Sequence, residues 1–375
     1  MFTSAHPSIV TLLPRGEGFS PQKAGAIALV VRDFVGHSKF QKQHTVFGSE
    51  LNSAFPECDY QPIKLPPWPI SSRSYRYFLG ADSLFKQMAP QLIELHNRAI
   101  YVPWIKRAFP NAALSFQLHN DPQTIRGLQF AKQRQAFLQI VDVVYCVSEY
   151  LKTRFLEGVE NHSNKVHVIP IGLDIDQIAP IMGERKPVIL FVGRIIPEKG
   201  ALLFAQAVRQ VLSKVPTPWR VEMIGAQRFG QHDKKSDYER QVLSVLEPLG
   251  ERVRYHGYLP FEQMLDKVEY AEIAVVPSQW HEPFGRTALE AMAGGAALVA
   301  TPYGGLAEVI GDAALRVDSD KASDFAEAIE RLIQNPGMRR TFQAKGLKRA
   351  EENFKIQDRV AELDRIRAQL FEKGP

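Results

Sequence analysis

The chain has 375 residues, 45% hydrophobic and 23% charged, with a formal net charge of +5. This composition excludes a low-complexity or fibrous chain, and the length suits two globular domains. No run of about 18 apolar residues and no secretory leader pattern is found, so a cytoplasmic protein without a spanning helix is expected. Cys58 and Cys146 are far apart and lack metal-ligand spacing, which argues against a disulfide framework.

The basic balance suggests an acidic partner, for which nucleic acid, anionic lipid and a phosphorylated substrate are the candidates. Nucleic acid is disfavoured because no basic run is dense and no nucleic-acid-binding module is recognisable. The stretch from Ser71 to Phe78 interleaves basic and aromatic residues on a predicted loop. Such a loop either packs its aromatic rings inward or contacts the headgroups of an anionic membrane.

The first half of the chain reads as alternating strands and helices, which predicts a parallel sheet. Ser8 to Leu13 is the first predicted strand, and Ala24 to Phe34 has helical periodicity. Gly16 and Gly18 lie between them, where glycine would let the backbone approach a phosphate. An ordinary strand-to-helix turn explains these two residues equally well.

Two histidines follow predicted strands in this half, His96 after Leu92 and its neighbours and His119 after the run that begins at Ala113. Open α/β sheets bind ligands at the carboxyl ends of their strands, so both are candidate ligand contacts. A structural role is the alternative for each. The segment from Leu173 to Pro187 breaks the periodicity and marks the predicted domain boundary.

The second half opens with a predicted buried strand, Val188 to Val192, which is followed by Arg194 and Lys199. Two fixed cations after a strand would stabilise a diphosphate leaving group as its charge develops. Arginine can also clamp a phosphate with two parallel hydrogen bonds. The alternative is a pair of solvated surface cations.

Two carboxylates stand eight positions apart near the middle of this half. Glu282 lies in a loop after an apolar strand, and Glu290 lies in a predicted helix from Arg286 to Ala293 that Gly294 ends. The amino terminus of such a helix attracts anions, because its first N–H groups lack partners. A dipole partner and a solvated surface glutamate are the alternatives for the two side chains.

The segments Glu282-Pro283-Phe284-Gly285 and Glu290-Ala291-Met292-Ala293 resemble the signature of the retaining glycosyltransferases of family 4. Three further segments are similar to the same family, namely 193–200, 253–259 and 302–308. The resemblance implies an α/β GT-B fold, with two Rossmann-like, doubly wound parallel-sheet domains facing a central cleft. Residues 1–175 would form the acceptor domain, 176–353 the donor domain and 354–375 a helix crossing back to the first domain.

The resemblance also implies the activity, which is transfer of a sugar from a nucleotide-diphosphate donor to an acceptor hydroxyl with retention of configuration. A UDP-sugar is favoured, with a glycan or lipid-linked acceptor such as lipopolysaccharide or exopolysaccharide. The alternatives are a GDP-mannose-dependent mannosyltransferase and a non-catalytic protein that binds a nucleotide sugar or glycan. A peripheral position at the inner membrane face fits such an acceptor.

Residue roles follow from the same resemblance. Glu282 would orient the donor sugar, Arg194 and Lys199 would bind the diphosphate, and His119 would contact the sugar from the first domain. The predicted donor-binding residues are Gly16, Gly18, Tyr258, Phe284, Gly285, Arg286, Thr287 and Glu290.

No metal ion or cofactor is expected, since cations and a helix amino terminus would carry the diphosphate charge. Asp318-Ser319-Asp320 looks like the metal-binding Asp-x-Asp of another glycosyltransferase fold. It precedes a predicted helix, where we expect an aspartate to serve as the cap. A nicotinamide dehydrogenase is disfavoured because Gly-x-Gly-x-x-Gly is missing from both halves.

Overall fold

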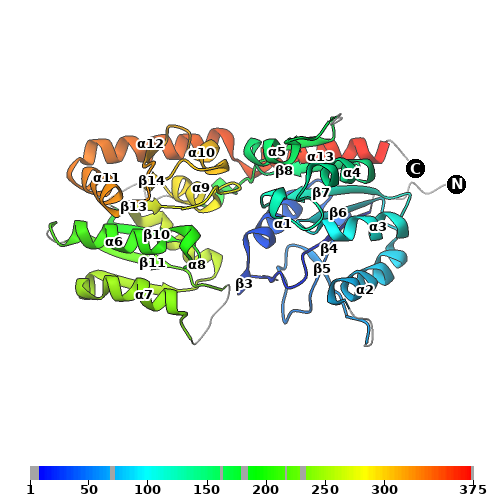
Figure 1. Ribbon diagram of the computed structural model, residues 1–375, viewed down its shortest axis with the longest axis horizontal. Coiled ribbons are helices and arrows are strands. Elements are labelled where there is room, and N and C mark those ends of the chain that lie inside the picture. Colours follow the sequence, from blue (N-terminus) through cyan, green and yellow to red (C-terminus); the bar gives the residue numbers. More distant parts are fainter. Residues whose placement is uncertain are drawn as a thin grey trace. The chain divides into compact units, whose positions relative to one another are not determined.

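The computed structural model describes residues 8–67, 72–160, 164–178, 185–215, 218–228 and 234–372. The chain divides into two compact units (Figure 1). Unit 1 consists of Met1–Gly172 and Ile356–Pro375, and unit 2 consists of Leu173–Lys355. Each unit is built on its own parallel sheet, as the alternating pattern predicts.

Unit 1 contains a seven-stranded parallel sheet with the order β5-β4-β1-β6-β7-β8-β9. Its strands are β1 (Ile9–Leu12), β4 (His44–Gly48), β5 (Asp59–Pro62), β6 (Leu92–His96), β7 (Ala113–Leu118), β8 (Val143–Cys146) and β9 (Val166–Val168). A short antiparallel hairpin, β2 (Phe19–Ser20) and β3 (Lys23–Ala24), follows β1. The order reverses between β1 and β6, which makes their carboxyl ends a topological switch point.

The helices of unit 1 are α1 (Ala26–Gly36), α2 (Arg73–Met88), α3 (Val102–Ala108), α4 (Ala131–Ile140), α5 (Glu149–Leu156) and α13 (Ile356–Glu372). Short 3-10 turns are η1 (Gln41–Gln43), η2 (Ala99–Tyr101) and η3 (Pro122–Thr124). The last helix, α13, contacts α1 and β6 although it is distant from them in sequence. Its Arg367 is buried and forms two hydrogen bonds with Glu94 of β6, at 2.9 and 2.8 Å.

The predicted loop from Ser71 to Phe78 was wrong over its described part, because α2 begins at Arg73. Residues 68–71 lie outside the described residues. The Ser72 hydroxyl accepts a hydrogen bond from the Tyr75 amide and so caps the helix. Tyr77 and Phe78 are buried, whereas Tyr75 remains 37% exposed. The aromatic rings are thus divided between the core and the surface by helical spacing.

Unit 2 contains a six-stranded parallel sheet with the order β12-β11-β10-β13-β14-β15. Its strands are β10 (Lys186–Val192), β11 (Arg220–Ile224), β12 (Val253–Gly257), β13 (Ala271–Val276), β14 (Ala297–Ala300) and β15 (Ala314–Arg316). Its helices are α6 (Ala201–Leu212), α7 (Asp237–Leu246), α8 (Phe261–Tyr270), α9 (Arg286–Ala293), α10 (Gly305–Ile310), α11 (Ala322–Gln334) and α12 (Pro336–Asn353), with 3-10 turns η4 (Ile175–Gln177), η5 (Pro197–Lys199) and η6 (Glu247–Arg252).

Helices cover both faces of this sheet because successive strand residues point to opposite sides. Ile189 and Phe191 of β10 pack in one core cluster with residues of α6, α7 and α11. Val188 and Leu190 pack in a second cluster with α8. In Figure 1, α6 and α7 lie side by side, and α9 lies beside α10 and α12. The order of strands reverses between β10 and β13, so the loops after these two strands meet.

Candidate functional site

The loops after β10 and β13 are held against each other at the switch point of unit 2. The amide of Gln279 donates to the carbonyl of Glu198 at 2.8 Å. Gly200 has φ of 68°, and a Cβ atom there would lie 1.9 Å from the carbonyl oxygen of Pro277. Only glycine permits this approach. The approach brings residues about 80 positions apart in the chain into one site.

Glu282 is the centre of this site. Its Oε1 accepts hydrogen bonds from Lys199 Nζ at 2.6 Å and from Ser278 Oγ at 2.6 Å. The Glu282 side chain is 5% exposed and the Lys199 side chain is 24% exposed. The ammonium also lies 5.4 Å from the centre of the Trp280 ring. The pair is therefore buried on the carboxylate side and open to solvent on the ammonium side.

The backbone of Glu282 is fixed by the glycine loop before α10. Glu282 and Gly304 form a parallel bridge, and the Gly305 amide donates to the Glu282 carbonyl at 2.7 Å. Gly304 has φ of 63°, and a Cβ atom there would lie 2.5 Å from that carbonyl oxygen. The loop at 302–308 thus holds the glutamate backbone in place.

The amino terminus of α9 follows directly. Gly285 is its N-cap with φ of 105°, Phe284 packs against Phe354, and Thr287 is half-buried. The first turn of a helix offers N–H groups without partners inside the helix. Arg286 Nε donates to Glu290 Oε1 at 2.8 Å, and its guanidinium lies 5.1 Å from the Phe261 ring. Arg286 and Glu290, two of the predicted donor-binding residues, are therefore buried and paired with each other.

Arg194 is half-buried after β10. In the parts of the chain that the structure describes, its guanidinium forms no hydrogen bond or ion pair. The neighbouring backbone is tightly held, because the Gly193 amide donates to the Ile224 carbonyl at 3.0 Å. A half-buried guanidinium without a protein partner is suited to bind an anionic ligand.

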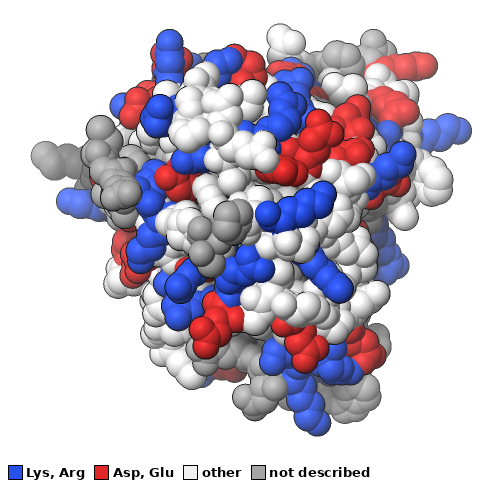
Figure 2. Space-filling model, turned by 90° about the vertical axis from the view of Figure 1, so that its left-hand side faces the viewer, with Lys and Arg blue, Asp and Glu red and all other residues white. Residues whose placement is uncertain are grey.

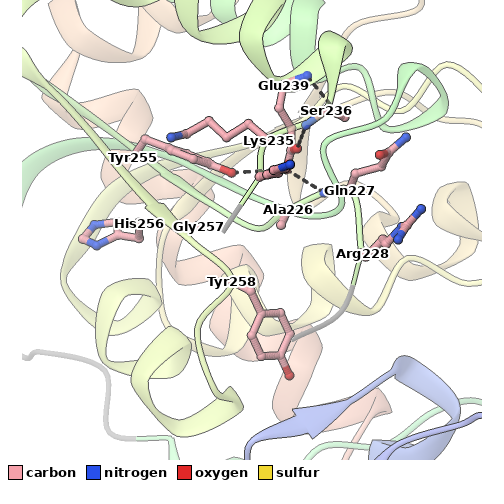
Figure 3. A pocket seen from close by; sticks show the side chains of 11 residues that line it. Ala226, Gln227, Arg228, Lys235, Ser236, Glu239, Tyr255, His256, Gly257 and Tyr258 are labelled. Carbon is pink, nitrogen blue, oxygen red and sulfur yellow. Dashed lines mark hydrogen bonds between the residues drawn. The ribbon is translucent and has the colours of Figure 1, made fainter. Parts of the chain in front are cut away.

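A cavity of about 700 Å³ opens at the ends of β11 and β12 (Figure 3). Its lining includes Gln227, Lys235, Tyr255 and Tyr258. Glu239 closes one side, with its Oε1 accepting from the Gln227 amide at 2.8 Å. Tyr258, one of the predicted donor-binding residues, is thus part of a cavity wall.

In unit 1, His119 contacts His96, the other histidine that the sequence predicts as a candidate ligand contact. The rings stack with Nδ1 of His96 2.9 Å from Nε2 of His119, and the His119 amide donates to Asn97 Oδ1 at 2.8 Å. Burial lowers the pKa of His96 to about 4 and that of His119 well below its usual value. Both rings are therefore neutral near pH 7, and one N–H is shared between them.

Gly16 and Gly18 lie in the loop between β1 and β2. Gly16 has φ of 86°, and a Cβ atom on Gly18 would lie 2.5 Å from the Lys23 carbonyl oxygen. The positive φ of Gly16 and the close approach of Gly18 to β3 account for these two glycines. Between them, Glu17 Oε1 accepts from the Ala28 amide at 3.3 Å in the first turn of α1. Burial raises the pKa of Glu17. The first turn of α1 thus already holds a carboxylate of this chain.

Among the described residues, no group of three or more His, Cys, Asp and Glu side chains is arranged to hold a metal ion. The expected aspartate cap near 318–320 was wrong. Lys321 is the N-cap of α11, and the Ser319 hydroxyl accepts from its amide at 3.0 Å. The Asp318 carboxylate interacts instead with the Tyr303 hydroxyl.

Sequence reasoning missed Ser278 and Glu17 as members of these sites. Ser278 ends a strand and precedes Glu282 by four residues, which is the signal that was available. The spacing of Arg286 and Glu290 also indicated an i,i+4 pair. Glu17 stands between the two glycines that drew attention to the loop, and its contact with α1 depends on how the hairpin folds.

The chain matches two family models. Residues 176–349 match Glycosyl transferases group 1, and residues 39–177 match Glycosyltransferase Family 4. Together the two matches run from residue 39 to residue 349 and so include parts of both units.

Curated relatives are similar over much of the chain. The lipopolysaccharide 1,2-N-acetylglucosaminetransferase of Salmonella typhimurium (strain LT2) is 26% identical over 66% of this chain and 63% of its own. A GDP-mannose-dependent monoacylated alpha-(1-6)-phosphatidylinositol monomannoside mannosyltransferase of Corynebacterium glutamicum is 25% identical over 89% of this chain and 92% of its own.

A solved structure of similar fold is sucrose-phosphate synthase from Thermosynechococcus elongatus, with a TM-score of 0.79, 20% identity, and coverage of 98% of this chain and 100% of that one. HepE of Anabaena, solved with UDP and glucose, has a TM-score of 0.77 at 17% identity and covers 97% of this chain and 100% of its own. The chain therefore belongs to the family 4 glycosyltransferases, within glycosyl transferases group 1, and has the GT-B fold of two Rossmann-like domains.

Proposed function

We propose that this protein is a retaining glycosyltransferase that moves a sugar from a UDP-sugar to a hydroxyl of a cell-envelope glycan or lipid-linked acceptor. The observation that carries the proposal is the meeting of Lys199, Ser278 and Glu282 at the switch point of unit 2. A cation, a neutral donor and a carboxylate at two neighbouring strand ends can bind the phosphates and the hydroxyls of a nucleotide sugar together.

The diphosphate is assigned to unit 2. Arg194 has no protein partner among the described residues, and the Lys199 ammonium is open to solvent. The first-turn amides of α9, around Thr287, supply further donors. These positive groups stabilise the leaving diphosphate most when the glycosidic bond breaks, which raises the rate of the chemical step. In unit 1, Glu17 already occupies the first turn of α1, so a phosphate there is disfavoured.

The base and the ribose extend from the diphosphate. The cavity beside Tyr258 has the size and the mixed polar and aromatic lining of a nucleotide-base site. Glu290 is assigned to the ribose hydroxyls, and its ion pair with Arg286 fixes the orientation of its carboxylate. His119 is assigned to a hydroxyl of the donor sugar.

Retention without a covalent intermediate suits the state of Glu282. Two donors hold its carboxylate, and the Lys199 cation reduces its nucleophilicity. We assign it to orienting the sugar. The acceptor hydroxyl then attacks the anomeric carbon on the same face from which the diphosphate leaves. The leaving phosphate takes the proton of that hydroxyl. No resident metal is required for this scheme.

The proposed acceptor rests on the relatives and on the surface of unit 1. One relative acts on lipopolysaccharide and another on a phosphatidylinositol mannoside, according to their names. On α2, Arg73 and Tyr75 are exposed, and the ring centre of Tyr75 lies 5.1 Å from that of Trp104. A basic and aromatic face of this kind suits peripheral contact with anionic lipid. Among the described residues, no helix has the length and apolar content that a bilayer span requires.

Nucleic acid is not proposed as a partner. On the face of the molecule drawn in Figure 2, Lys and Arg side chains are interspersed with Asp and Glu. Proteins that bind nucleic acid gather basic side chains on one surface.

The test is binding and slow hydrolysis of UDP-glucose, UDP-N-acetylglucosamine, UDP-galactose and GDP-mannose, each in EDTA and in magnesium. We expect one UDP-sugar to turn over in EDTA. Turnover of GDP-mannose alone would instead establish the alternative, a GDP-mannose-dependent mannosyltransferase. The name of the Corynebacterium glutamicum relative specifies the same donor. Binding without turnover, with and without candidate acceptors, would favour the non-catalytic alternative. No binding of any donor would contradict the proposal.

A further inference from the structure

The Glu282 carboxylate receives both of its hydrogen bonds on one oxygen. Lys199 Nζ and Ser278 Oγ each donate to Oε1 at 2.6 Å. For the described residues, no hydrogen bond to Oε2 is found. A carboxylate can accept about four hydrogen bonds over its two oxygens. One oxygen is therefore well supplied with donors, and the other keeps its full capacity to accept.

Ser278 is itself held rigidly. It lies directly after β13 and is 1% exposed, and its carbonyl accepts from the Thr301 hydroxyl at 2.9 Å at the end of β14. The backbone of Glu282 is fixed independently by the Gly305 amide. With both backbones anchored, the short bond between the two side chains sets the rotation of the carboxylate. Such preorganisation is what a site needs to bind a sugar in one pose.

We propose, resting on the proposed function, that Ser278 is a positioning residue that turns Glu282 Oε2 toward the hydroxyls of the donor sugar. Lys199 alone does not suffice for this task, because its ammonium is also assigned to the diphosphate. When the ammonium moves toward the phosphates, Ser278 is the donor that remains on Oε1. The Ser278 hydroxyl thus keeps Glu282 oriented toward the sugar while Lys199 binds the diphosphate.

The first experiment compares Ser278→Ala with wild type in donor turnover. A hydrogen bond to a charged group contributes about 1.5–3 kcal/mol, so we expect kcat to fall by about tenfold to a hundredfold. The affinity for UDP, which lacks the sugar, should stay within about twofold. Ser244→Ala, the same change at an exposed serine of α7, is the matched control and should leave both values unchanged. Ser278→Thr keeps the hydroxyl and should recover most of the lost rate.

A double-mutant comparison separates positioning from a general structural effect. In a Glu282→Gln background, Ser278→Ala should lower kcat by less than about twofold, because its effect passes through the carboxylate. Full kcat in Ser278→Ala, or an equal fold-loss in both backgrounds, would overturn the positioning role. If Ser278→Ala does not fold, Ser278→Cys, a near-isosteric change to a weak donor, takes its place in both comparisons. Absence of turnover by wild type would instead overturn the proposed function itself.

Discussion

Arg367 in unit 1 and Arg194 in unit 2 show two uses of a buried or half-buried arginine. Arg367 is buried, and each of its three side-chain nitrogens donates a hydrogen bond, to Glu94, Asp364 or the Ser38 hydroxyl. Arg194 is half-buried, and the described part of the chain offers its guanidinium no partner. Arg367 joins the last helix to the sheet of unit 1, whereas the N–H groups of Arg194 are available to bind a ligand.

The same contrast separates two glutamates. Glu94 uses both carboxylate oxygens, with Arg367 on both and Thr11 on Oε2, and this guanidinium holds its pKa down at about 2. Among the described residues, Glu282 accepts hydrogen bonds on Oε1 and none on Oε2. A buried charge whose hydrogen bonds are all made within the protein stabilises the fold, whereas a charge with unused capacity is able to bind a ligand. The number of hydrogen bonds that each carboxylate already accepts within the protein therefore distinguishes Glu94 from Glu282 better than burial does.

The largest expected effect is on stability, from Arg367→Met. The change leaves the buried carboxylates of Glu94 and Asp364 unpaired, so the free energy of unfolding should fall by about 3–5 kcal/mol. Arg365→Met, on an exposed face of the same helix, should change it by less than about 0.5 kcal/mol. Denaturant unfolding of both variants measures the difference, and equal stabilities would contradict a structural role for the network.

Arg194→Met should have the opposite profile. We expect the dissociation constant for UDP to rise by about tenfold to a hundredfold, because a charge-assisted hydrogen bond is lost. The free energy of unfolding should stay within about 0.5 kcal/mol of wild type, since none of the described residues forms a hydrogen bond or ion pair with the Arg194 guanidinium. Arg209→Met, at an exposed position of α6, is the control for calorimetric titration with UDP. Unchanged UDP affinity would remove Arg194 from the diphosphate site.

Acid should weaken unit 1 in a graded way. Burial lowers the pKa of His44 to about 3 and that of His96 to about 4 in the folded protein. Folding favours the neutral form of both histidines. Their contribution to the free energy of unfolding is therefore fully present above about pH 6.5, and it is lost as the pH falls toward the lowered pKa values of the folded protein. Glu94, with a pKa of about 2, adds a loss below about pH 4.5. Hydrogen exchange of the β4 and β6 amides against pH should show the decline, and His44→Gln should flatten it.

Thr11→Val should have the smallest effect. The Thr11 hydroxyl lies 2.8 Å from His44 Nε2 and donates to Glu94 at 3.2 Å. Its loss leaves a buried imidazole nitrogen without this partner, which should cost about 1–2 kcal/mol of unfolding free energy. Donor turnover should not change. Thr341→Val, whose hydroxyl donates to Gly337 at an exposed site of α12, is the matched control in thermal unfolding.

Most strands and helices were predictable, either because their residues repeat with the period of the structure or because a short apolar run indicates a buried strand. Phe191 and its neighbours form a continuous apolar run and become a buried strand. The start of α2 was missed because the basic and aromatic residues after Ser72 were interpreted as a surface loop. The serine cap and the i,i+4 spacing of Tyr77, Ala81 and Phe85 were the overlooked signals.

The candidate residues of unit 2 were predictable one by one, mostly through the family resemblance, but their contacts were not. Lys199 and Glu282 are 83 positions apart, and they meet because β10 and β13 are neighbours at the switch point. Sequence spacing carries no information on which strands become neighbours. The one-sided bonding of Glu282 likewise depends on rotamers and backbone anchors that only the folded chain defines.

The central claim is that Glu282 orients the donor sugar, and Glu282→Gln tests it most directly. The decisive measurement is kcat with the preferred donor, together with the dissociation constant for UDP. The change keeps shape and removes charge, so we expect kcat to fall by about a hundredfold or more while UDP affinity changes little. Glu262→Gln, at an exposed position of α8, is the control. Full turnover by Glu282→Gln would contradict the account.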